Sequence, residues 1–387
     1  MTGEGDLASR WLGASVIAAS DESFGEKENL LTPAPAAFEP GHYGNRGEIV
    51  DGWETRRRRE AGHDWAIVRL GAPGIITSVD VDTSFFTGNY PQSASVEACG
   101  CEGYPRPTEL ADWETIVPRS ALTGDSHNVF AVTSQRRFTH VRLSAYPDGG
   151  IARLRVHGDV VPDPRGLEHL TVDLASQEYG GCVVASSDDF YTAASALNRP
   201  DTARTMGEGW ETQRRRDSGH DFAVLRLAFA GRIRRAIIDT AHFKYNASAA
   251  VALSGYTKEV EPGSPDWRPL LDRVRLQPDT RHVYDLAPAD PVSYVRLDAF
   301  PDGGISRVRL IGTIDPAARR TAGYRWFNAL PASQARQCLT DAGVPAEQAT
   351  AVADQRPVSE QWLRRRVEAG SNQAVAILAG MLDTGAG

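Results

Sequence analysis

The fold is decided by the stretch Gly52-Trp53-Glu54-Thr55-Arg56-Arg57-Arg58-Arg59 and by Gly62-His63-Asp64-Trp65 just after it. Both return later in the chain, as Gly209-Trp210-Glu211-Thr212-Gln213-Arg214-Arg215-Arg216 and Gly219-His220-Asp221-Phe222. The shift from position 52 to position 209 is 157 residues. This shift is too long for a solenoid or propeller unit, and it suits a whole domain. The sequence therefore predicts a duplicated domain.

The bulk composition is that of a globular protein. The chain has 387 residues, of which 41% are hydrophobic and 24% charged, and its net charge is −8. This length allows two to three domains with cores of their own. The acidic balance argues against nucleic acid as a partner. No apolar run approaches the length of a membrane span, so we expect no membrane partner either.

Residues 11–19 resemble the core of a short signal peptide, but they follow the acidic Glu4 and Asp6 rather than a basic region. Residues 15–24 also have an internal counterpart at 182–190. A removable peptide would not recur inside the chain, so we interpret this segment as the start of each repeat and predict a cytoplasmic protein.

The four cysteines fit that prediction, because they are too few and too scattered for a disulfide framework. Cys99 and Cys101 have the spacing of one strand face, which would suit two ligands of a metal. No second pair with zinc spacing exists, so buried small side chains are the preferred interpretation. The other two cysteines are Cys182 and Cys338.

The remaining pattern is that of short strands. Residues 141–156 alternate apolar and charged side chains around a Pro-Asp-Gly-Gly turn, and 295–310 repeat this, which predicts hairpin-like edges of a sheet. Other strands are predicted at 66–70, 75–82 and 94–99, and at 223–227, 233–239 and 249–254. Many short strands without helical crossovers favour a mainly β protein built of antiparallel sandwiches or jelly rolls.

We predict three parts: a first jelly-roll repeat at 1–162, a second at 166–314 and a small helical tail at 318–387. Pro162 and Pro164 mark the linker between the repeats. In the tail, apolar residues fall at helical spacing in 333–342 and 347–353. The arginine run 364–366 is interpreted as a solvated helix face.

Polar loops beside the strand ends are the candidate functional residues. Residues 51–64 carry carboxylates, arginines and a histidine, and residues 82–89 follow the next strands. If these loops emerge at one end of a sandwich, they surround a small-molecule site. Each residue also has a structural alternative: Trp53 and Trp65 suit packing, His63 a structural hydrogen bond, and Asp82 a turn. The recurrence of the whole set favours function, although duplication preserves folding determinants equally well.

These motifs, together with residues 81–91 (VDTSFFTGNYP) and 95–99 (SVEAC), resemble the allantoicase family over both repeats, about residues 10–314. The resemblance implies two jelly-roll domains related to galactose-binding modules. It also implies a hydrolase acting on carbon–nitrogen bonds in linear amidines, which cleaves allantoate to ureidoglycolate and urea in purine (allantoin) degradation. Residues 327–331 faintly resemble the opening of a ureidoimidazoline decarboxylase, but the tail is too short for that enzyme.

The implied reaction needs an acid, a base and a clamp for the substrate carboxylate, because urea leaves intact and the bond to the central carbon breaks. Arg56 or Arg57 is expected to clamp the carboxylate with its planar fork. His63 and Glu54 are expected to transfer protons, with Asp64 orienting the imidazole or substituting for it. The ureido N–H groups need acceptors, for which the candidates are Asp82, Ser84, Asn89 and Glu97.

The second repeat is expected to be the weaker site. Tyr245 replaces Gly88, Pro91 has no obvious counterpart, and Glu97 aligns with Ala252 if a two-residue gap is allowed. A tyrosine reaches positive φ less readily than a glycine. The equivalent positions that keep polar side chains are Glu211, His220, Asp221, Asp239, His242 and Asn246.

Two alternatives stay open on the residues alone. A tandem jelly-roll protein that binds carbohydrate or another small ligand without catalysis is the rival function. The histidines and carboxylates leave room for a divalent metal, but no spacing requires one, and we assign no metal ligands. We expect a small ureido acid as substrate and a homo-oligomer whose site could also be completed between chains.

Overall fold

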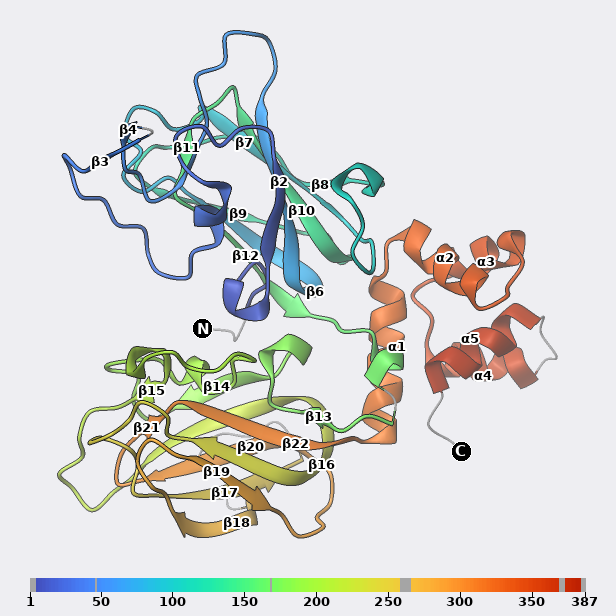
Figure 1. Cartoon of the computed structure of the whole chain (residues 1–387). Helices are drawn as coiled ribbons and strands as arrows, with labels where there is room; N and C mark the ends of the chain where they lie inside the picture. Colours follow the sequence, from blue (N-terminus) through green and yellow to red (C-terminus); the bar gives the residue numbers. More distant parts are fainter. Residues whose placement is uncertain (1–4, 46, 168, 258–265, 369–372, 384–387) are drawn as a thin grey trace. The chain divides into compact units, whose positions relative to one another are not determined.

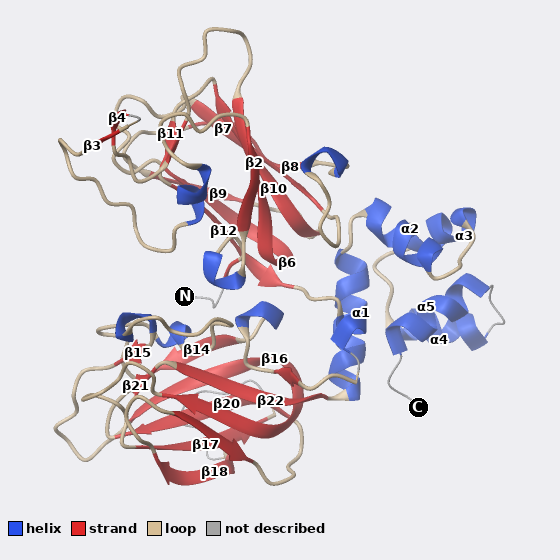
Figure 2. Ribbon diagram, viewed as in Figure 1, coloured by secondary structure: helices blue, strands red, loops and turns tan. Residues whose placement is uncertain are grey.

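The computed structural model describes the whole chain except residues 1–4, 46, 168, 258–265, 369–372 and 384–387. It divides into two compact units, one of Glu4–Pro162 with Arg325–Ala379, the other built on Asp163–Tyr324. Each unit contains one repeat, and the strands of the two repeats follow the same order (Figures 1 and 2). The predicted domain boundaries stay a prediction.

The first repeat is an antiparallel sandwich with a short accessory hairpin. Its strands are β1 (Gly5–Asp6), β2 (Ser15–Ala19), β3 (Tyr43–Gly44), β4 (Gly47–Glu48), β5 (Trp53–Glu54), β6 (Asp64–Asp82), β7 (Ser93–Cys99), β8 (Glu114–Ala121), β9 (His127–Ala131), β10 (Arg137–Tyr146), β11 (Gly150–Ile151) and β12 (Arg153–Val160). Short 3-10 turns lie between them, at η1 (Arg10–Leu12), η2 (Lys27–Leu31) and η3 (Pro107–Glu109).

One long strand, β6, belongs to both layers of this sandwich. Its first part pairs with β2 and β10, and β10 continues the layer through β7 to β8. Its second part pairs with β12 and β9 in the other layer. The two sets of partners overlap at Gly74 and Ile75, which pair with both β10 and β12. The sequence prediction of separate strands at 66–70 and 75–82 was therefore wrong, because Pro73 does not end the strand, which runs from Asp64 to Asp82.

The predicted hairpin at 141–156 was also wrong. β10 lies between β6 and β7, while β12 pairs with β1 and the far part of β6, so the two strands belong to different layers. The Pro-Asp-Gly-Gly turn carries the chain from one layer to the other, and the short β11 after it pairs with β5. Period-two alternation identified the strands correctly but says nothing of their partners.

The second repeat has the same topology. Its strands are β13 (Val172–Asp173), β14 (Cys182–Ser186), β15 (Trp210–Glu211), β16 (Asp221–Asp239), β17 (Ala250–Tyr256), β18 (Arg268–Arg275), β19 (Arg281–Asp285), β20 (Val292–Phe300), β21 (Gly304–Ile305) and β22 (Arg307–Ile314), with 3-10 turns η4 (Pro164–Leu167), η5 (Gln177–Tyr179), η6 (Ala194–Ala196) and η7 (Met206–Glu208). β16 takes the place of β6 and pairs with β14, β20, β22 and β19. The mainly β fold with two antiparallel sandwich domains is confirmed.

The repeated motif is in large part a folding element. Trp53 is fully buried in the core, and its indole Nε1 donates to the carbonyl oxygen of Asp21 at 2.8 Å. Gly52 has no room for a side chain, because a Cβ there would lie 2.7 Å from the Phe86 ring. The Thr55 hydroxyl accepts from the Gly149 amide at 3.1 Å, which ties the motif to the Pro-Asp-Gly-Gly turn. The structural alternative for Trp53 is thus confirmed.

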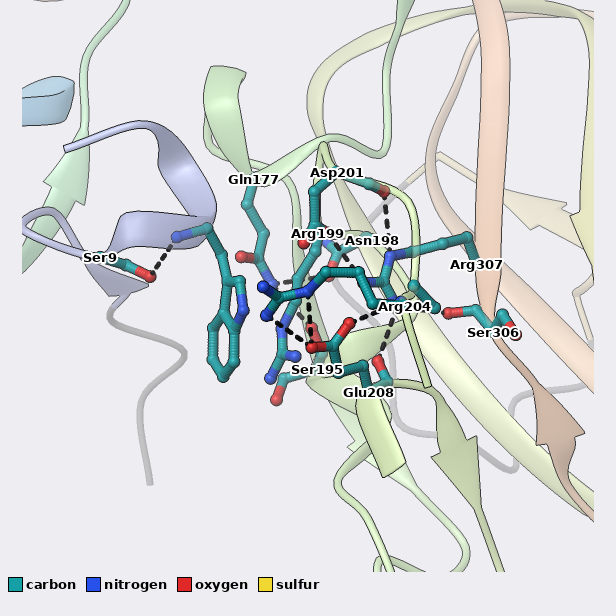
Figure 3. Close-up of polar contacts among 12 residues, drawn as sticks. Ser9, Gln177, Ser195, Asn198, Arg199, Asp201, Arg204, Glu208, Ser306 and Arg307 are labelled. Atoms are coloured by element: carbon teal, nitrogen blue, oxygen red, sulfur yellow. Dashed lines mark hydrogen bonds and ion pairs between the residues drawn. The ribbon is translucent and has the colours of Figure 1, made fainter. Parts of the chain in front are cut away.

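A buried arginine holds the long loop of each repeat. Arg153 is 1% exposed, and its guanidinium donates to the carbonyl oxygen of Asp51 at 2.7 Å and to its carboxylate at 2.6 Å. In the second repeat, Arg307 donates to the Asp201 carboxylate at 2.7 Å and to the Glu208 carbonyl oxygen at 2.6 Å (Figure 3). Each guanidinium thus donates to loop carbonyl oxygens that have no partner in a regular helix or strand.

The chain ends in helices α1 (Pro316–Ala329), α2 (Ala332–Asp341), α3 (Ala346–Ala353), α4 (Glu360–Glu368) and α5 (Gln373–Asp383). The predicted helices at 333–342 and 347–353 are confirmed as α2 and α3. Arg364, Arg365 and Arg366 are exposed on α4, as expected of a solvated face. Gln334 on α2 donates to Glu102 of the first sandwich at 2.8 Å. Among the described residues, no helix is both long and apolar enough to cross a membrane.

Candidate active site

A cavity of about 830 Å³ lies over the outer face of the layer formed by β6, β10, β7 and β8 of the first repeat. The side chains between its lining residues, such as Val96 and Leu143, point into the core instead. The cavity lining consists of Arg58, Gly62, His63, Trp65, Ile67, Ser95, Glu97, Pro107, Thr108, Thr115, Pro118, Arg119, Arg142, Ser144 and Tyr146. His63 and Glu97 are the two sequence-predicted residues that the structure brings together here.

His63 precedes β6 and places its imidazole at the edge of this cavity. Its ring lies against that of Tyr146 on β10, with the ring centres 4.6 Å apart. The Tyr146 hydroxyl in turn lies 3.0 Å from the Ser95 hydroxyl on β7. A half-buried imidazole held by a ring contact keeps its nitrogens available to a ligand, which suits a proton-transfer role.

Glu97 on β7 is held by Arg142 on the neighbouring strand. The Arg142 guanidinium donates to one Glu97 carboxylate oxygen through Nε at 2.9 Å and through Nη2 at 2.6 Å. It also lies 4.6 Å from the centre of the Trp113 ring. Because the guanidinium is restrained on both sides, the carboxylate has a fixed orientation and its second oxygen is left to accept from a ligand.

Arg58 is the residue of the arginine run that lines the cavity. Its backbone amide donates to the Asp148 carboxylate at 2.8 Å, and its guanidinium Nη1 pairs with Asp64 at 2.8 Å. Asp64 is 1% exposed and also accepts from the Ser20 hydroxyl at 3.0 Å. The structure therefore gives Asp64 contacts with Arg58 and Ser20, where the sequence predicted that it would orient His63.

Arg119 on β8 brings a further positive charge to the cavity. Its guanidinium lies 4.2 Å from the centre of the Tyr146 ring, and its Nε donates to the Ser93 hydroxyl at 2.8 Å. Arg58 and Arg142 each have a carboxylate partner, whereas the contacts recorded for Arg119 are with uncharged groups. Within the described residues, Arg119 is thus the lining arginine whose charge no carboxylate neutralises.

Glu54 and Asn89 form a separate polar pair. The Asn89 amide donates to the Glu54 carboxylate at 2.6 Å. Burial raises the pKa of the Glu54 carboxyl above its usual value, and the hydrogen bond from Asn89 opposes this. Glu54 lies on β5, which pairs with β11, so it is held beside the Pro-Asp-Gly-Gly turn and is not among the residues that line the cavity.

The remaining predicted residues of the first repeat have local partners. Asp82 accepts from the backbone amide of Ser84 at 2.8 Å and from its hydroxyl at 2.6 Å, which is the turn-forming arrangement. Arg56 is 76% exposed and lies 3.4 Å from Asp21. Arg57 is exposed. These four residues are not among those that line the cavity.

The second repeat contains counterparts of the Glu54–Asn89 pair and of the Arg58–Asp64 ion pair. Asn246 donates to Glu211 at 2.5 Å, and Arg215 pairs with the buried Asp221 at 2.9 Å. His220 Nε2 lies 3.0 Å from a carboxylate oxygen of Asp298. The other two candidates shape a turn: Asp239 accepts from the Ala241 amide at 2.8 Å, and the His242 amide donates to Asp279 at 2.7 Å, with His242 at φ 70°.

The sheet register corrects one alignment. Glu97 faces Arg142 across β7 and β10, and the residue that faces the equivalent Arg296 is Ser254. The match of Glu97 with Ala252 was therefore wrong, because no gap interrupts the repeat here: Ala252 corresponds to Ser95. Sequence reasoning also missed Arg58, Arg119, Arg142 and Tyr146. For Arg58 a signal existed, since Arg56 becomes Gln213 in the second repeat while Arg58 persists as Arg215.

No group of three or more His, Cys, Asp or Glu side chains that could hold a metal ion occurs among the residues the structure describes. The four cysteines, all of which the structure describes, form no disulfide. Cys99 is buried, and burial raises its pKa to about 12. A thiol with so high a pKa is neutral at physiological pH, which is consistent with a packing role.

Comparison with known proteins assigns this architecture to a family. The family model described as "Allantoicase repeat" matches residues 5–161 and again 172–315. The chain belongs to the allantoicase family. It is 49% identical to a probable allantoicase of Streptomyces coelicolor over 83% of this chain and 89% of the relative, and 51% identical to one of Nocardia farcinica over 80% and 94%. The crystal structure of Saccharomyces cerevisiae allantoicase is 34% identical, with a TM-score of 0.70, over 80% of this chain and 93% of that one.

Proposed function

We propose that this protein hydrolyses allantoate to ureidoglycolate and urea, and that the chemistry takes place in the cavity of the first repeat. Family membership supports the reaction. The observation that supports the location is the lining of the cavity, which combines an imidazole held against a tyrosine ring, an oriented carboxylate and an arginine without a carboxylate partner. These are the groups that an anionic substrate with ureido N–H donors requires.

The reaction sets the roles. Urea is released intact, so the bond between the central carbon and a ureido nitrogen breaks. One group protonates the leaving nitrogen while another assists loss of the proton on the remaining ureido nitrogen, and water then adds to the resulting C=N bond. The atoms balance as allantoate plus water giving ureidoglycolate plus urea.

We assign the carboxylate clamp to Arg119. The substrate carries one negative charge on its carboxylate, and Arg58 and Arg142 already have carboxylate partners at 2.8 and 2.6 Å. Stacking on Tyr146 and the bond to Ser93 orient the Arg119 guanidinium. A planar guanidinium fixed in this way binds a carboxylate in bidentate fashion. Arg56 is less suitable, because it lies 3.4 Å from the carboxylate of Asp21 and does not line the cavity.

His63 is our candidate for the proton donor to the leaving nitrogen. It lines the cavity and is restrained by Tyr146. Glu97 is our candidate for accepting from the ureido N–H whose proton is lost, since Arg142 fixes its carboxylate in the same cavity. Asp64 is then a positioning residue, which acts through Arg58.

Glu54 remains the alternative acid. Its raised pKa is a property expected of a carboxyl that donates a proton near neutral pH, and Asn89 beside it offers both donor and acceptor groups. Asp82 and Ser84 are assigned to the turn that carries this loop. Since a carbohydrate-binding module would rely on aromatic platforms and neutral amides, the charged lining argues against the rival function of passive ligand binding.

We further propose a cytoplasmic enzyme, because its four cysteines, all described by the structure, form no disulfide. We also propose that it forms a homo-oligomer, as most assemblies of one chain are symmetric. A divalent metal is not assigned to any residue here.

The test is urea release from allantoate by the purified protein and by His63→Asn and Glu54→Gln. We expect His63→Asn to lower kcat by about 10²-fold or more with the fold intact, as removal of a general acid typically does. Urea release by His63→Asn at near wild-type rates, with a large loss in Glu54→Gln, would move the chemistry to the Glu54–Asn89 pair. No urea release by the wild-type protein, with or without added divalent metal, would favour the binding function.

A further inference from the structure

The outer face of the second sandwich carries a polar cluster that corresponds position by position to the first cavity. Across β20 and β17, Phe300 faces Ala250 as Tyr146 faces Ser93 across β10 and β7. The register therefore equates Arg296 with Arg142, Asp298 with Ser144 and Phe300 with Tyr146. On the edge strand, β17 pairs with β18 as β7 pairs with β8, which equates Arg273 with Arg119.

The contacts within this cluster resemble those of the first repeat. The ring of His220 lies against that of Phe300 with ring centres 4.4 Å apart and the planes tilted by 32°, as His63 lies against Tyr146 at 4.6 Å and 36°. The Arg273 guanidinium lies 4.0 Å from the centre of the Phe300 ring, close to the 4.2 Å between Arg119 and Tyr146. An imidazole and an arginine are thus held against one aromatic ring in both repeats.

The carboxylate has moved to another strand. In the first repeat it is Glu97 on β7, paired with Arg142. In the second repeat Ser254 occupies that position, and Asp298 on β20 supplies the carboxylate, with Arg296 Nε at 2.7 Å and His220 Nε2 at 3.0 Å. Two arginines, one carboxylate and one histidine are therefore present on both faces, although only the arginines and the histidine are at equivalent positions.

Two further substitutions form a matched pair. The hydroxyls of Ser95 and Tyr146 lie 3.0 Å apart in the first repeat, and both are missing in the second, where Ala252 and Phe300 stand instead. Removing both partners of a hydrogen bond leaves no polar atom unsatisfied. The second face has thus been rebuilt with its packing preserved and its charged groups retained.

Folding alone does not explain Asp298. The first repeat builds the same sandwich with Ser144 at that position, so the fold does not require a carboxylate there. Asp298 is 16% exposed and Arg296 19%, so both charges have lost most of their hydration, and their pairing at 2.7 Å offsets only part of that cost. As in the first repeat, Arg273 on the edge strand is exposed and its recorded contact is with an aromatic ring.

We propose that this cluster, defined as His220, Arg273, Arg296, Asp298 and Phe300, is a second binding site for a small carboxylic acid bearing a ureido group. This inference rests on the proposed function for the class of ligand. Arg273 binds the carboxylate of the ligand, and Asp298 accepts from its ureido N–H groups. The direct contact between His220 and Asp298 gives this site a different donor pattern from the first, where the carboxylate is bound by arginine.

The experiment follows the imidazole resonances of His220 by NMR in protein with isotope-labelled histidine. These resonances are assigned as the ones that disappear in His220→Asn. Allantoate is titrated into the His63→Asn variant, in which the first site is expected not to hydrolyse it. We expect the His220 resonances to shift and saturate. Arg273→Gln should weaken this titration about tenfold or more, since a charge-assisted contact is lost. Arg281→Gln on β19, which pairs with β16 in the other layer, is the matched control and should titrate within twofold of its parent.

The proposal is overturned if the His220 resonances do not move at saturating allantoate, or if Arg273→Gln titrates like Arg281→Gln. Failure of the proposed function has different signatures. Absence of urea release by the wild-type protein contradicts the reaction, and undiminished urea release by His63→Asn contradicts its assignment to the first cavity. In that case ureidoglycolate, which is not consumed by the reaction, replaces allantoate as the titrant, and the same two outcomes decide the second site.

Discussion

Replacing Glu97 with glutamine tests the proposed site most directly. The substitution keeps the size of the side chain but removes the charge that Arg142 binds through two hydrogen bonds of 2.9 and 2.6 Å. The two side chains are 26% and 32% exposed, so water screens part of their interaction. We therefore expect the free energy of unfolding to fall by only about 1 kcal/mol, at the low end for charged hydrogen bonds.

The effect on turnover should be much larger. If Glu97 accepts the ureido N–H as its proton is lost, a neutral amide supplies far less stabilisation of the transition state, and we expect kcat to fall by about 10²-fold, or roughly 2.7 kcal/mol. The activity assay is the initial rate of urea release over a range of allantoate concentrations. The free energy of unfolding is measured separately with guanidinium or heat, because urea is also the product of the reaction.

Glu114→Gln is the matched control, because Glu114 is exposed on β8 next to Thr115, which faces Glu97, and it does not line the cavity. It should leave both quantities within experimental error of the wild type. A Glu97→Gln enzyme with kcat within threefold of wild type would refute the assignment of the cavity as the catalytic centre. An unfolded Glu97→Gln protein would refute the expectation that the free energy of unfolding falls by only about 1 kcal/mol.

The remaining predictions concern buried charge. His140 is 1% exposed, and burial, with Arg69 as a second cause, lowers its pKa from 6.5 to about 4. Between pH 6.5 and 4 the unfolded chain therefore binds a proton that the folded chain does not. The contribution of the neutral His140 to the free energy of unfolding is fully present above pH 6.5 and falls by about 3 kcal/mol as the pH drops to 4. Denaturant titrations of His140→Gln should lack this part of the acid sensitivity. Arg153→Gln should lower the free energy of unfolding by about 3–5 kcal/mol, because it leaves Asp51 and two loop carbonyl groups without their partner. Guanidinium denaturation against Arg106→Gln, an exposed arginine, measures that loss.

The sequence was sufficient for the architecture. The repeated Gly-Trp-Glu-Thr motif indicated a duplication, and alternation of apolar residues identified the strands, because both depend on local properties of the chain. The partners of those strands were predicted less well. The Pro-Asp-Gly-Gly turn is as typical of a hairpin as of a crossover between layers, and β6 continues through Pro73. Pairing is decided by tertiary packing, which a local pattern does not contain.

The site was predictable only where its residues are motif residues. His63 and Glu97 were selected from quoted motifs, and both line the cavity. Arg142 and Arg119 were passed over, because alternating charged residues on a strand are also what a solvated sheet face contains. Their selection requires knowing that β7, β8 and β10 are neighbours in one layer. The carboxylate of Asp298 was missed for the same reason, since its counterpart Glu97 lies on a different strand.

The comparison of the two repeats separates the residues that build the fold from those that address the ligand. Trp53, Thr55, Arg58 and Asp64 make the same contacts in the second copy, where Trp210 donates to a loop carbonyl oxygen, Thr212 accepts from Gly303 and Arg215 pairs with Asp221. These contacts position the loop that ends in His63 or His220. The carboxylate and the ring hydroxyl, in contrast, differ between the copies without loss of any such contact. A duplicated chain that keeps its loop-positioning contacts while it varies the carboxylate and the ring hydroxyl of this face is what two binding sites of different specificity would require.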